Sequence, residues 1–182
     1  MQPGGAGRGV IGVAGGGVVA DDGSFAEFYS GCRRRLVGEL SVVLASVPEA
    51  EDVVQEAFAV AYRQWAKISG YDEPAAFVRR VALNIAWKRQ RGFRRRLAAV
   101  ERLGAAGEQA DEHSDEHVDL GRALRELPFD QRVALMLFHV ADLSVAAIAQ
   151  ELDVPTGTVK ARLSRGRAAL RLRLAYDEEV TQ

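Results

Sequence analysis

Three things are scarce in this 182-residue sequence, and each scarcity narrows the class of protein. Cys32 is the single cysteine, so no disulfide can form within the chain, and a reducing compartment such as the cytoplasm is expected. No apolar run reaches the roughly 20 residues that a membrane-spanning helix requires, so membrane insertion is not expected. An excess of positive charge is also lacking, because the formal net charge is −1. Taken alone, that value argues against a nucleic-acid partner.

The distribution of charge along the chain reverses that last inference. Residues 24–97 carry 13 Lys or Arg against 8 Asp or Glu, and residues 122–175 carry 9 against 5. Between these blocks, residues 98–121 carry 1 Arg against 7 acidic residues, and the last seven residues carry 3 acids and no base. Two basic blocks separated by an acidic one indicate two surfaces for a polyanion.

Residues 1–23 contain nine glycines and few side chains that could anchor them, which predicts a disordered leader. The segment includes "GRGVIG", residues 7–12, which matches the G-x-G-x-x-G pattern of dinucleotide-binding proteins. A genuine fingerprint follows a strand and opens a helix within a βαβ unit. Neither feature is present here, so no cofactor is expected.

The remainder of the chain predicts an all-α fold, because apolar residues recur at helical spacing and no segment shows strand alternation. "SFAE" predicts a capping box formed by Ser24 and Glu27. A second helix is expected over residues 48–68, and a third opens at Pro74 and closes at Gly92. The predicted organisation is a helical domain at 24–97, a flexible acidic linker at 98–118, a second helical domain at 119–175 and an acidic tail at 176–182.

The stretch "LSVAAIAQELDVPTGTVKARLSRGRAAL", residues 143–170, predicts a helix-turn-helix. Ser144 is a suitable N-cap for the first helix, and Asp153 stands in the turn where glycine is common but left-handed backbone is tolerated. Arginine can contact guanine or phosphate through a two-pronged hydrogen bond, so the second helix is interpreted as a DNA reader rather than a solvated basic helix. Its outward residues are Thr158, Lys160, Arg162, Arg165 and Arg167.

A second basic row is predicted on the helix that opens at Pro74. Arg80, Asn84, Lys88 and Arg91 are spaced i, i+4, i+8 and i+11, which places them on one helical face. Asn84 is unusual in this row, because asparagine lowers helix propensity and three cations already provide solubility. Its side chain could read a base edge, adenine being its usual partner, or simply lie exposed on a solvated face.

Taken together, these motifs resemble the sigma-70 family of RNA polymerase sigma factors, in its extracytoplasmic-function (ECF) group. "AEDVVQEAFAVAYRQW", residues 50–65, resembles the helix that binds core polymerase, and "PAAFVRRVALNIAWKRQRG", residues 74–92, resembles the helix that reads the promoter −10 element. Residues 124–170 resemble the domain that reads the −35 element. The three motifs occur in the family's order and spacing. Ala147, where the family often has an acidic residue, and the glycine-rich leader are departures.

The resemblance implies a non-catalytic protein that gives polymerase its promoter specificity and helps to open the DNA. Asp52, Gln55, Glu56 and Phe58 match positions expected to bind the β′ coiled coil, with the β subunit as a further partner. The loop at residues 69–74 and the helix after it match the region that holds an unstacked −10 base. An anti-sigma factor is common in the family, although nothing in this sequence requires one.

Three alternatives remain open. A response-regulator-type activator would use the same helix-turn-helix but would leave residues 50–65 and 80–91 unexplained. An enzyme is conceivable because "HSDEH" places His113 and His117 four residues apart among acids, although no third metal ligand and no nucleophile–base pair is visible. A decoy that only occupies polymerase is the third. No catalytic residue or metal site is therefore expected.

Overall fold

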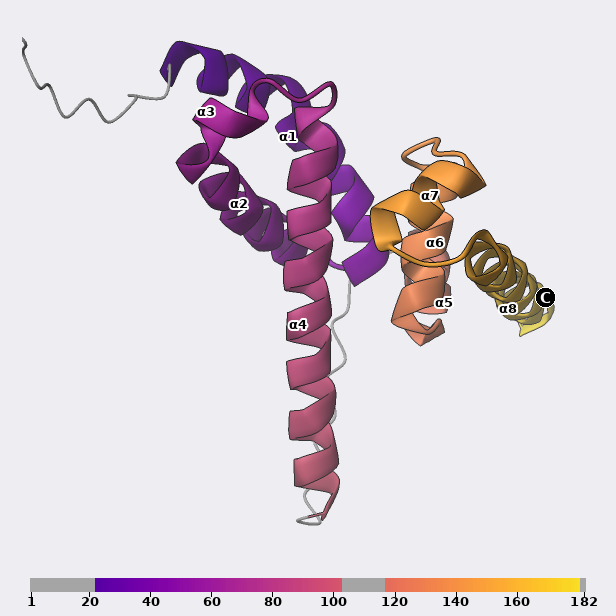
Figure 1. Cartoon of the computed structure of the whole chain (residues 1–182). Coiled ribbons are helices and arrows are strands. Elements are labelled where there is room, and N and C mark those ends of the chain that lie inside the picture. Colours follow the sequence, from indigo (N-terminus) through magenta and orange to yellow (C-terminus); the bar gives the residue numbers. More distant parts are fainter. Residues whose placement is uncertain (1–21, 103–116, 181–182) are drawn as a thin grey trace, which may run out of the picture.

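The computed structural model describes residues 22–102 and 117–180, and their fold is all-α, as predicted (Figure 1). The glycine-rich segment before residue 22, with its "GRGVIG", lies outside the described residues, as does residue 113. No helix in the described ranges is both long and apolar enough to cross a membrane. The helices, in chain order, are α1 Asp22–Leu44, α2 Val47–Arg63, α3 Trp65–Ile68, α4 Pro74–Arg102, α5 His117–Glu126, α6 Phe129–His139, α7 Val145–Leu152 and α8 Thr156–Val180.

An aromatic cluster joins α1, α2 and α3 at one end of the first domain. Phe28 stacks on Trp65 with ring centroids 4.8 Å apart, and Tyr29 meets Phe58 edge-on at 4.7 Å. The Trp65 indole N–H donates to the Ser24 hydroxyl over 3.1 Å. The predicted capping box at Ser24 is therefore wrong, because α1 begins earlier, at Asp22, and this hydroxyl serves the tryptophan instead.

The expected end of the third helix at Gly92 is also wrong, since α4 continues to Arg102. Glycine costs a helix interior only about 1 kcal/mol, and strong helix formers follow it here. Both ends of the segment predicted as a linker, 98–118, are helical, because α5 already begins at His117. Residues 103–116 lie outside the described residues. The acidic tail is helical as far as Val180.

The second domain is organised around α6, which packs against α8. Val133, Ala134 and Leu137 of α6 are fully buried, as is Val159 of α8. At Gly166 the two helices approach closely, because a Cβ atom there would lie 2.9 Å from the Leu135 side chain. The glycine thus permits α8 to lie directly on α6.

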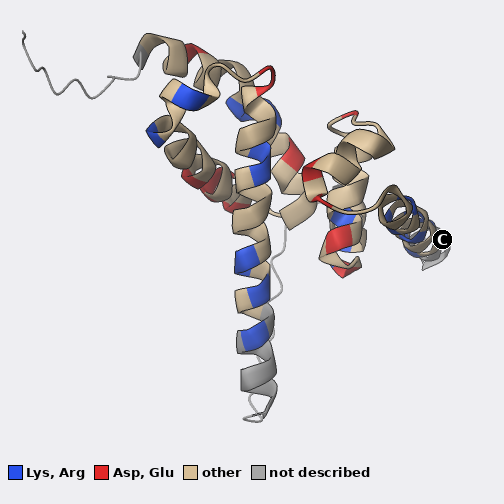
Figure 2. Ribbon diagram, viewed as in Figure 1, with Lys and Arg blue, Asp and Glu red and all other residues tan. Residues whose placement is uncertain are grey.

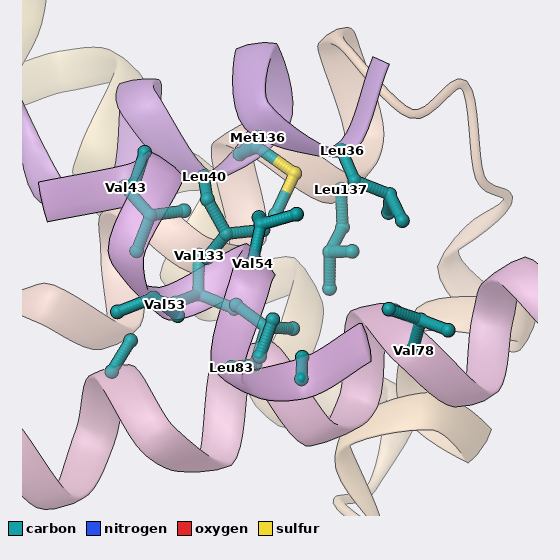
Figure 3. Close-up of a cluster of buried hydrophobic side chains, with 14 of the residues drawn as sticks. Leu36, Leu40, Val43, Val53, Val54, Val78, Leu83, Val133, Met136 and Leu137 are labelled. Carbon is teal, nitrogen blue, oxygen red and sulfur yellow. The ribbon is translucent and has the colours of Figure 1, made fainter. Parts of the chain in front are cut away.

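The two domains are packed on one another and share one apolar core. Figure 3 shows Leu36, Leu40 and Val43 of α1 in one cluster with Met136 and Leu137 of α6, and all five are fully buried. The cluster extends through Val53 and Val54 of α2 to Val78 and Leu83 of α4. The two domains expected from the sequence are therefore held together as one closed body.

Candidate nucleic-acid interface

Basic side chains gather on two helices, and acidic ones on a third. Figure 2 shows Lys and Arg recurring along α4 and along α8, whereas Asp and Glu recur along α2. The basic helices are those that the sequence predicted to contact DNA. The acidic helix is the one predicted to contact polymerase.

The helix-turn-helix is formed by α7, a short turn and α8. The Ser144 hydroxyl accepts the Ala147 backbone N–H over 3.2 Å, which confirms the predicted N-cap. Asp153 adopts left-handed backbone with φ 52° and ψ 52°, as its position in the turn predicted. Ile148 of α7 and Val159 of α8 are both fully buried between the helices. The turn chemistry and the core together fix the angle at which α8 is presented.

The predicted −35 residues on α8 are presented in two ways. Lys160 and Arg165 are exposed, and Thr158 is half-buried. Arg162 is held back, because its guanidinium donates to Asp130 over 2.8 Å and its side chain is only 18% exposed. Arg167 donates to His139 over 3.2 Å and lies over the Phe138 ring at 4.9 Å. Arg165 donates only to the Ala161 carbonyl of its own helix over 3.3 Å, whereas Arg162 and Arg167 are held by side chains of α6.

A shallow groove of about 370 Å³ runs beside this row. Lys160, Ser164 and Arg167 line one side of the groove, and Phe138 and Val145 line the other. Cations and a hydroxyl beside an apolar wall suit a phosphate backbone passing over a groove edge.

The predicted −10 row on α4 is exposed at all four residues, but only its first half borders the second domain. Arg80 and Asn84 line a cavity of about 400 Å³ whose opposite wall is formed by the end of α7 and the residue after it: Gln150, Glu151, Leu152 and Asp153. Lys88 and Arg91, further along α4, are exposed and line none of this cavity. The row is therefore continuous and exposed on the helix, and its first half faces the end of α7 across the cavity.

A buried ion-pair network lies next to this cavity, which Glu151 also lines. Arg79 of α4 donates to Glu39 of α1 over 2.7 Å and to Glu151 of α7 over 3.2 Å. The three side chains are only 4%, 1% and 8% exposed, so the network connects the two domains away from water. An unpaired charge in this buried network would destabilise the fold. Arg79 therefore stabilises the packing of the helices and does not face DNA.

The pKa values of Glu151 and Arg79 are both raised, but for different reasons. Burial is the largest influence on Glu151 and raises the pKa of its carboxyl, although Arg79 and Arg80 act to lower it. Burial also acts to lower the pKa of Arg79, but its hydrogen bonds and charge contacts with the two carboxylates outweigh burial and raise that pKa. Two carboxylates share one guanidinium, so the cation is well satisfied and the charge on Glu151 is not. One oxygen of Glu151 and one of Glu39 are buried without a hydrogen-bond partner.

A second contact joins the two basic helices, α4 and α8, through one carboxylate. The Trp87 indole N–H of α4 donates to one Asp130 oxygen over 3.1 Å, and Arg162 of α8 donates to the other over 2.8 Å. The Trp87 ring also packs on Phe129, with centroids 5.6 Å apart. Trp87 is thus engaged with the second domain.

The predicted polymerase-binding residues on α2 do not all face outward. Asp52, Gln55 and Glu56 are exposed, and Glu56 forms a 3.0 Å ion pair with Arg89 of α4. Phe58 is only 2% exposed, because it fills the aromatic cluster described above. Its role as a direct contact needs correction: the buried ring supports the exposed face without forming part of it.

Sequence reasoning missed Glu39, Asp130 and Glu151. One of them carried a signal, because Glu39 lies between Leu36 and Val43 on the apolar face of α1, where an acid requires a buried partner. Asp130 and Glu151 look like ordinary surface acids in the sequence. Their partners are 43 and 72 positions away. Among the described side chains, no group of His, Cys, Asp and Glu is placed to hold a metal ion.

Comparisons with known proteins match the two halves separately and the chain as a whole. Residues 28–96 match the family model for sigma-70 region 2, and residues 117–170 match that for sigma-70 region 4. The chain is 31% identical to the ECF RNA polymerase sigma factor SigW of Bacillus subtilis, over 72% of this chain and 79% of that protein. It is 32% identical to the ECF RNA polymerase sigma-E factor of Escherichia coli K12, over 71% and 77% respectively.

A solved structure shares the fold. The sigma factor RpoE from Bartonella quintana, crystallised in complex with the anti-sigma factor NepR, superposes with a TM-score of 0.65 at 23% identity. The likeness covers 83% of this chain and 98% of that one. It therefore includes both helical domains and not the helix-turn-helix alone.

Proposed function

The chain belongs to the ECF group of the sigma-70 family, so it directs promoter-specific transcription initiation with core RNA polymerase, and we propose that three of its surfaces divide this work. The observation that carries the proposal is the placement of two basic rows on α4 and α8, in separate family regions, with an acidic-polar face on α2. DNA and a protein partner require opposite surface chemistry, and this chain offers both.

The second domain, residues 119–175, reads the −35 element through α8. Lys160 and Arg165 are the principal contacts, because they are exposed on the outward face. Thr158, Arg162 and Arg167 complete the set, and Arg162 must first leave Asp130 to reach a base. The helix-turn-helix places such side chains at the edges of bases in the major groove.

The first domain, residues 24–97, reads the −10 element through α4 and binds polymerase through α2. Arg80, Asn84, Lys88 and Arg91 form the −10 surface, and the opened strand passes over it. The cleft of about 460 Å³ formed by Gly70, Tyr71, Asp72, Glu73, Ala76, Phe77 and Arg80 is the place proposed for an unstacked base. Asp52, Gln55 and Glu56 bind the β′ coiled coil, and the β subunit is a further partner.

Residues 98–118 connect the two readers, and the acidic segment 176–182 follows the second. Sigma factors are non-catalytic initiation factors, and we propose that this chain likewise has no catalytic site and uses no cofactor. It acts in the cytoplasm, where polymerase and promoters are found. We propose an anti-sigma factor as a further partner, because the similar sigma factor RpoE was solved in complex with one.

Run-off transcription with purified core polymerase tests the proposal. The full-length chain is added to core enzyme with a library of genomic promoter fragments, and specific transcripts are sequenced. We expect start sites that share one −35 and one −10 motif. If the chain bound core polymerase but gave no specific transcript from any fragment, the decoy alternative would replace this function.

A further inference from the structure

The groove beside α8 is lined on that helix by a row of polar side chains. Val145, the first residue of α7, and Phe138, in the last turn of α6, form the opposite wall. In helix-turn-helix proteins the first helix crosses the phosphate backbone of DNA, so a phosphate is the expected occupant of a groove beside α7. The row is spaced i, i+4, i+7 and i+11, and it consists of Lys160, Ser164, Arg167 and Arg171.

Arg167 is held from two sides by neighbouring residues at the end of α6. Its Nε–H donates to Nε2 of His139 over 3.2 Å. Its guanidinium carbon lies 4.9 Å from the centre of the Phe138 ring, which is a cation–π contact. The Phe138 and His139 rings in turn meet edge-on, with centroids 5.0 Å apart. Two consecutive side chains of α6 therefore fix the position of one guanidinium of α8.

These contacts leave the phosphate-binding part of the guanidinium available. Arginine has five N–H donors, and the two Nη groups form the forked pair of hydrogen bonds that a phosphate accepts. His139 uses the Nε–H of Arg167, and Phe138 uses one face of the guanidinium. A long side chain that is ordered before binding loses less conformational entropy when the ligand arrives.

We propose that His139, together with Phe138, is a positioning residue that holds Arg167 ready to bind a DNA phosphate in this groove. His139 acts through Arg167 and does not itself contact DNA. The assignment of this phosphate to the −35 element rests on the proposed function, whereas the positioning of Arg167 rests on contacts within the second domain. Nothing in the sequence indicated this role, because His139 and Arg167 are 28 positions apart.

The test replaces His139 with two side chains of similar bulk. His139→Gln keeps a hydrogen-bond acceptor that reaches the position of Nε2, whereas His139→Leu removes the acceptor. His139 is exposed, so both variants should keep the wild-type helical circular dichroism. Val140→Ala is the control at the end of α6, because Val140 is the next residue, is also exposed and does not line the groove.

Binding is measured with the full-length chain and a mixed-sequence DNA duplex at several low salt concentrations, because a phosphate contact does not depend on sequence. His139→Leu should weaken binding about threefold, which is within the range expected for disordering one long side chain. His139→Gln and Val140→Ala should bind as the wild type does. Arg167→Ala should weaken binding at least about tenfold and reduce the slope of log affinity against log salt by about 1.

A double-mutant cycle separates positioning from direct contact. In an Arg167→Ala background, His139→Leu should cost nothing further, because the side chain that His139 positions is gone. Arg171→Ala provides the matched background, since it removes a cation from the same groove but not the partner of His139. In that background His139→Leu should still weaken binding about threefold.

A spectroscopic readout reports on the side chain itself, without DNA. The ¹⁵Nε–¹H resonance of Arg167 is assigned by its loss in Arg167→Ala. In the wild type and in His139→Gln this proton should exchange slowly with water, because it is hydrogen-bonded. In His139→Leu it should exchange rapidly.

The proposal is overturned if His139→Leu binds DNA as tightly as the wild type, or if its cost persists in the Arg167→Ala background. Rapid exchange of the Arg167 Nε–H in the wild type also overturns it. The run-off assay reports separately on the proposed function. Specific starts combined with a failed cycle would leave that function standing without this role for His139. A successful cycle without specific starts would leave a DNA phosphate site that has no promoter role.

Discussion

The basic rows on α4 and α8 have the same chemistry but different surroundings. On α8 the restraints come from the row's own domain, since Arg162 and Arg167 are held by Asp130 and His139. On α4 the restraint comes from the other domain, since the end of α7 lies across from Arg80 and Asn84. The α8 row is thus restrained by side chains of its own domain, whereas the first half of the α4 row borders a cavity formed between the two domains.

The largest expected effect comes from removing the buried cation Arg79. Arg79→Ala leaves Glu39 and Glu151 buried without their shared partner, and breaking a buried pair in this way costs about 3–5 kcal/mol. We expect the midpoint of urea denaturation to fall sharply. Arg80→Ala, one residue along and exposed, should change the unfolding free energy by less than about 0.5 kcal/mol. Equal losses for both variants would contradict a structural role specific to Arg79.

A change on α2 should separate polymerase binding from both DNA rows. Asp52→Lys reverses an exposed charge on the face proposed for the β′ coiled coil, and a misplaced like charge at an interface costs several kcal/mol. We expect weaker binding to core polymerase in a fluorescence competition assay, with −10 oligonucleotide affinity unchanged. Glu51→Lys is the control on the same helix, because Glu51 pairs with Arg33 within the chain. An equal loss for Glu51→Lys would show a general charge effect.

Arg165 should contribute more than Arg162 to −35 affinity, because Arg165 is exposed and Arg162 is ion-paired with Asp130. Arg165→Ala removes an exposed reader and should cost about 1–3 kcal/mol of −35 affinity, with relaxed preference at one base position. Arg162→Ala should cost less, because part of its binding energy is spent in leaving Asp130. Competition assays with single-base variants of the −35 site, using the polymerase-bound protein, measure both. If Arg162→Ala proved the more damaging change, Asp130 would position that side chain for DNA instead of restraining it.

Within the α4 row, Lys88 and Asn84 should separate phosphate contact from base reading. Lys88→Ala should weaken binding to all −10 strands about equally and reduce the slope of log affinity against log salt by about 1. Asn84→Ala should leave that slope unchanged and reduce the preference for one base, adenine being the expected one. Titrations of the polymerase-bound protein at several salt concentrations provide the measurement. A changed salt slope for Asn84→Ala would indicate that Asn84 contacts the DNA phosphates instead of a base.

The smallest expected effect is a pH dependence of closure, meaning the packing of α7 and its Glu151 against α4. The raised pKa of Glu151 means that the closed form takes up its proton more readily than a form in which Glu151 is solvated. Closure should therefore strengthen as pH falls from 7 toward the ordinary carboxyl range near about 4.3, and weaken as pH rises through the raised value. Arg79 and Arg80 of α4 and Glu39 of α1 are the charged groups that face or share this site. In protein labelled with 5-fluorotryptophan, the ¹⁹F resonance of Trp87, which contacts Asp130 of the second domain, reports the degree of closure. The pH dependence of this resonance should be smaller in Glu151→Gln.

The local features of the readers could be predicted from the sequence, because they depend on spacing and turn chemistry. The all-α fold, the Ser144 cap and the left-handed Asp153 follow from short-range rules and are confirmed. The end of α4 and the cap of α1 were wrong, since Gly92 was given more weight than the helix formers after it, and the Ser24 partner lies 41 positions away. The burial of Phe58 depends on rings contributed by α1, and the contact of α7 with α4 depends on the packing of the two domains. No local pattern contains that information.

The shared apolar core has a consequence for the life of the protein between synthesis and assembly. Leu36 and Val43 on α1, and Val133 and Met136 on α6, are all fully buried in the closed body. A chain that opened without polymerase nearby would expose these side chains as a contiguous apolar patch, and such patches promote aggregation. We expect variants whose two domains separate to lose solubility before they lose helical content. A newly made molecule is therefore best protected from aggregation while its two domains remain packed together.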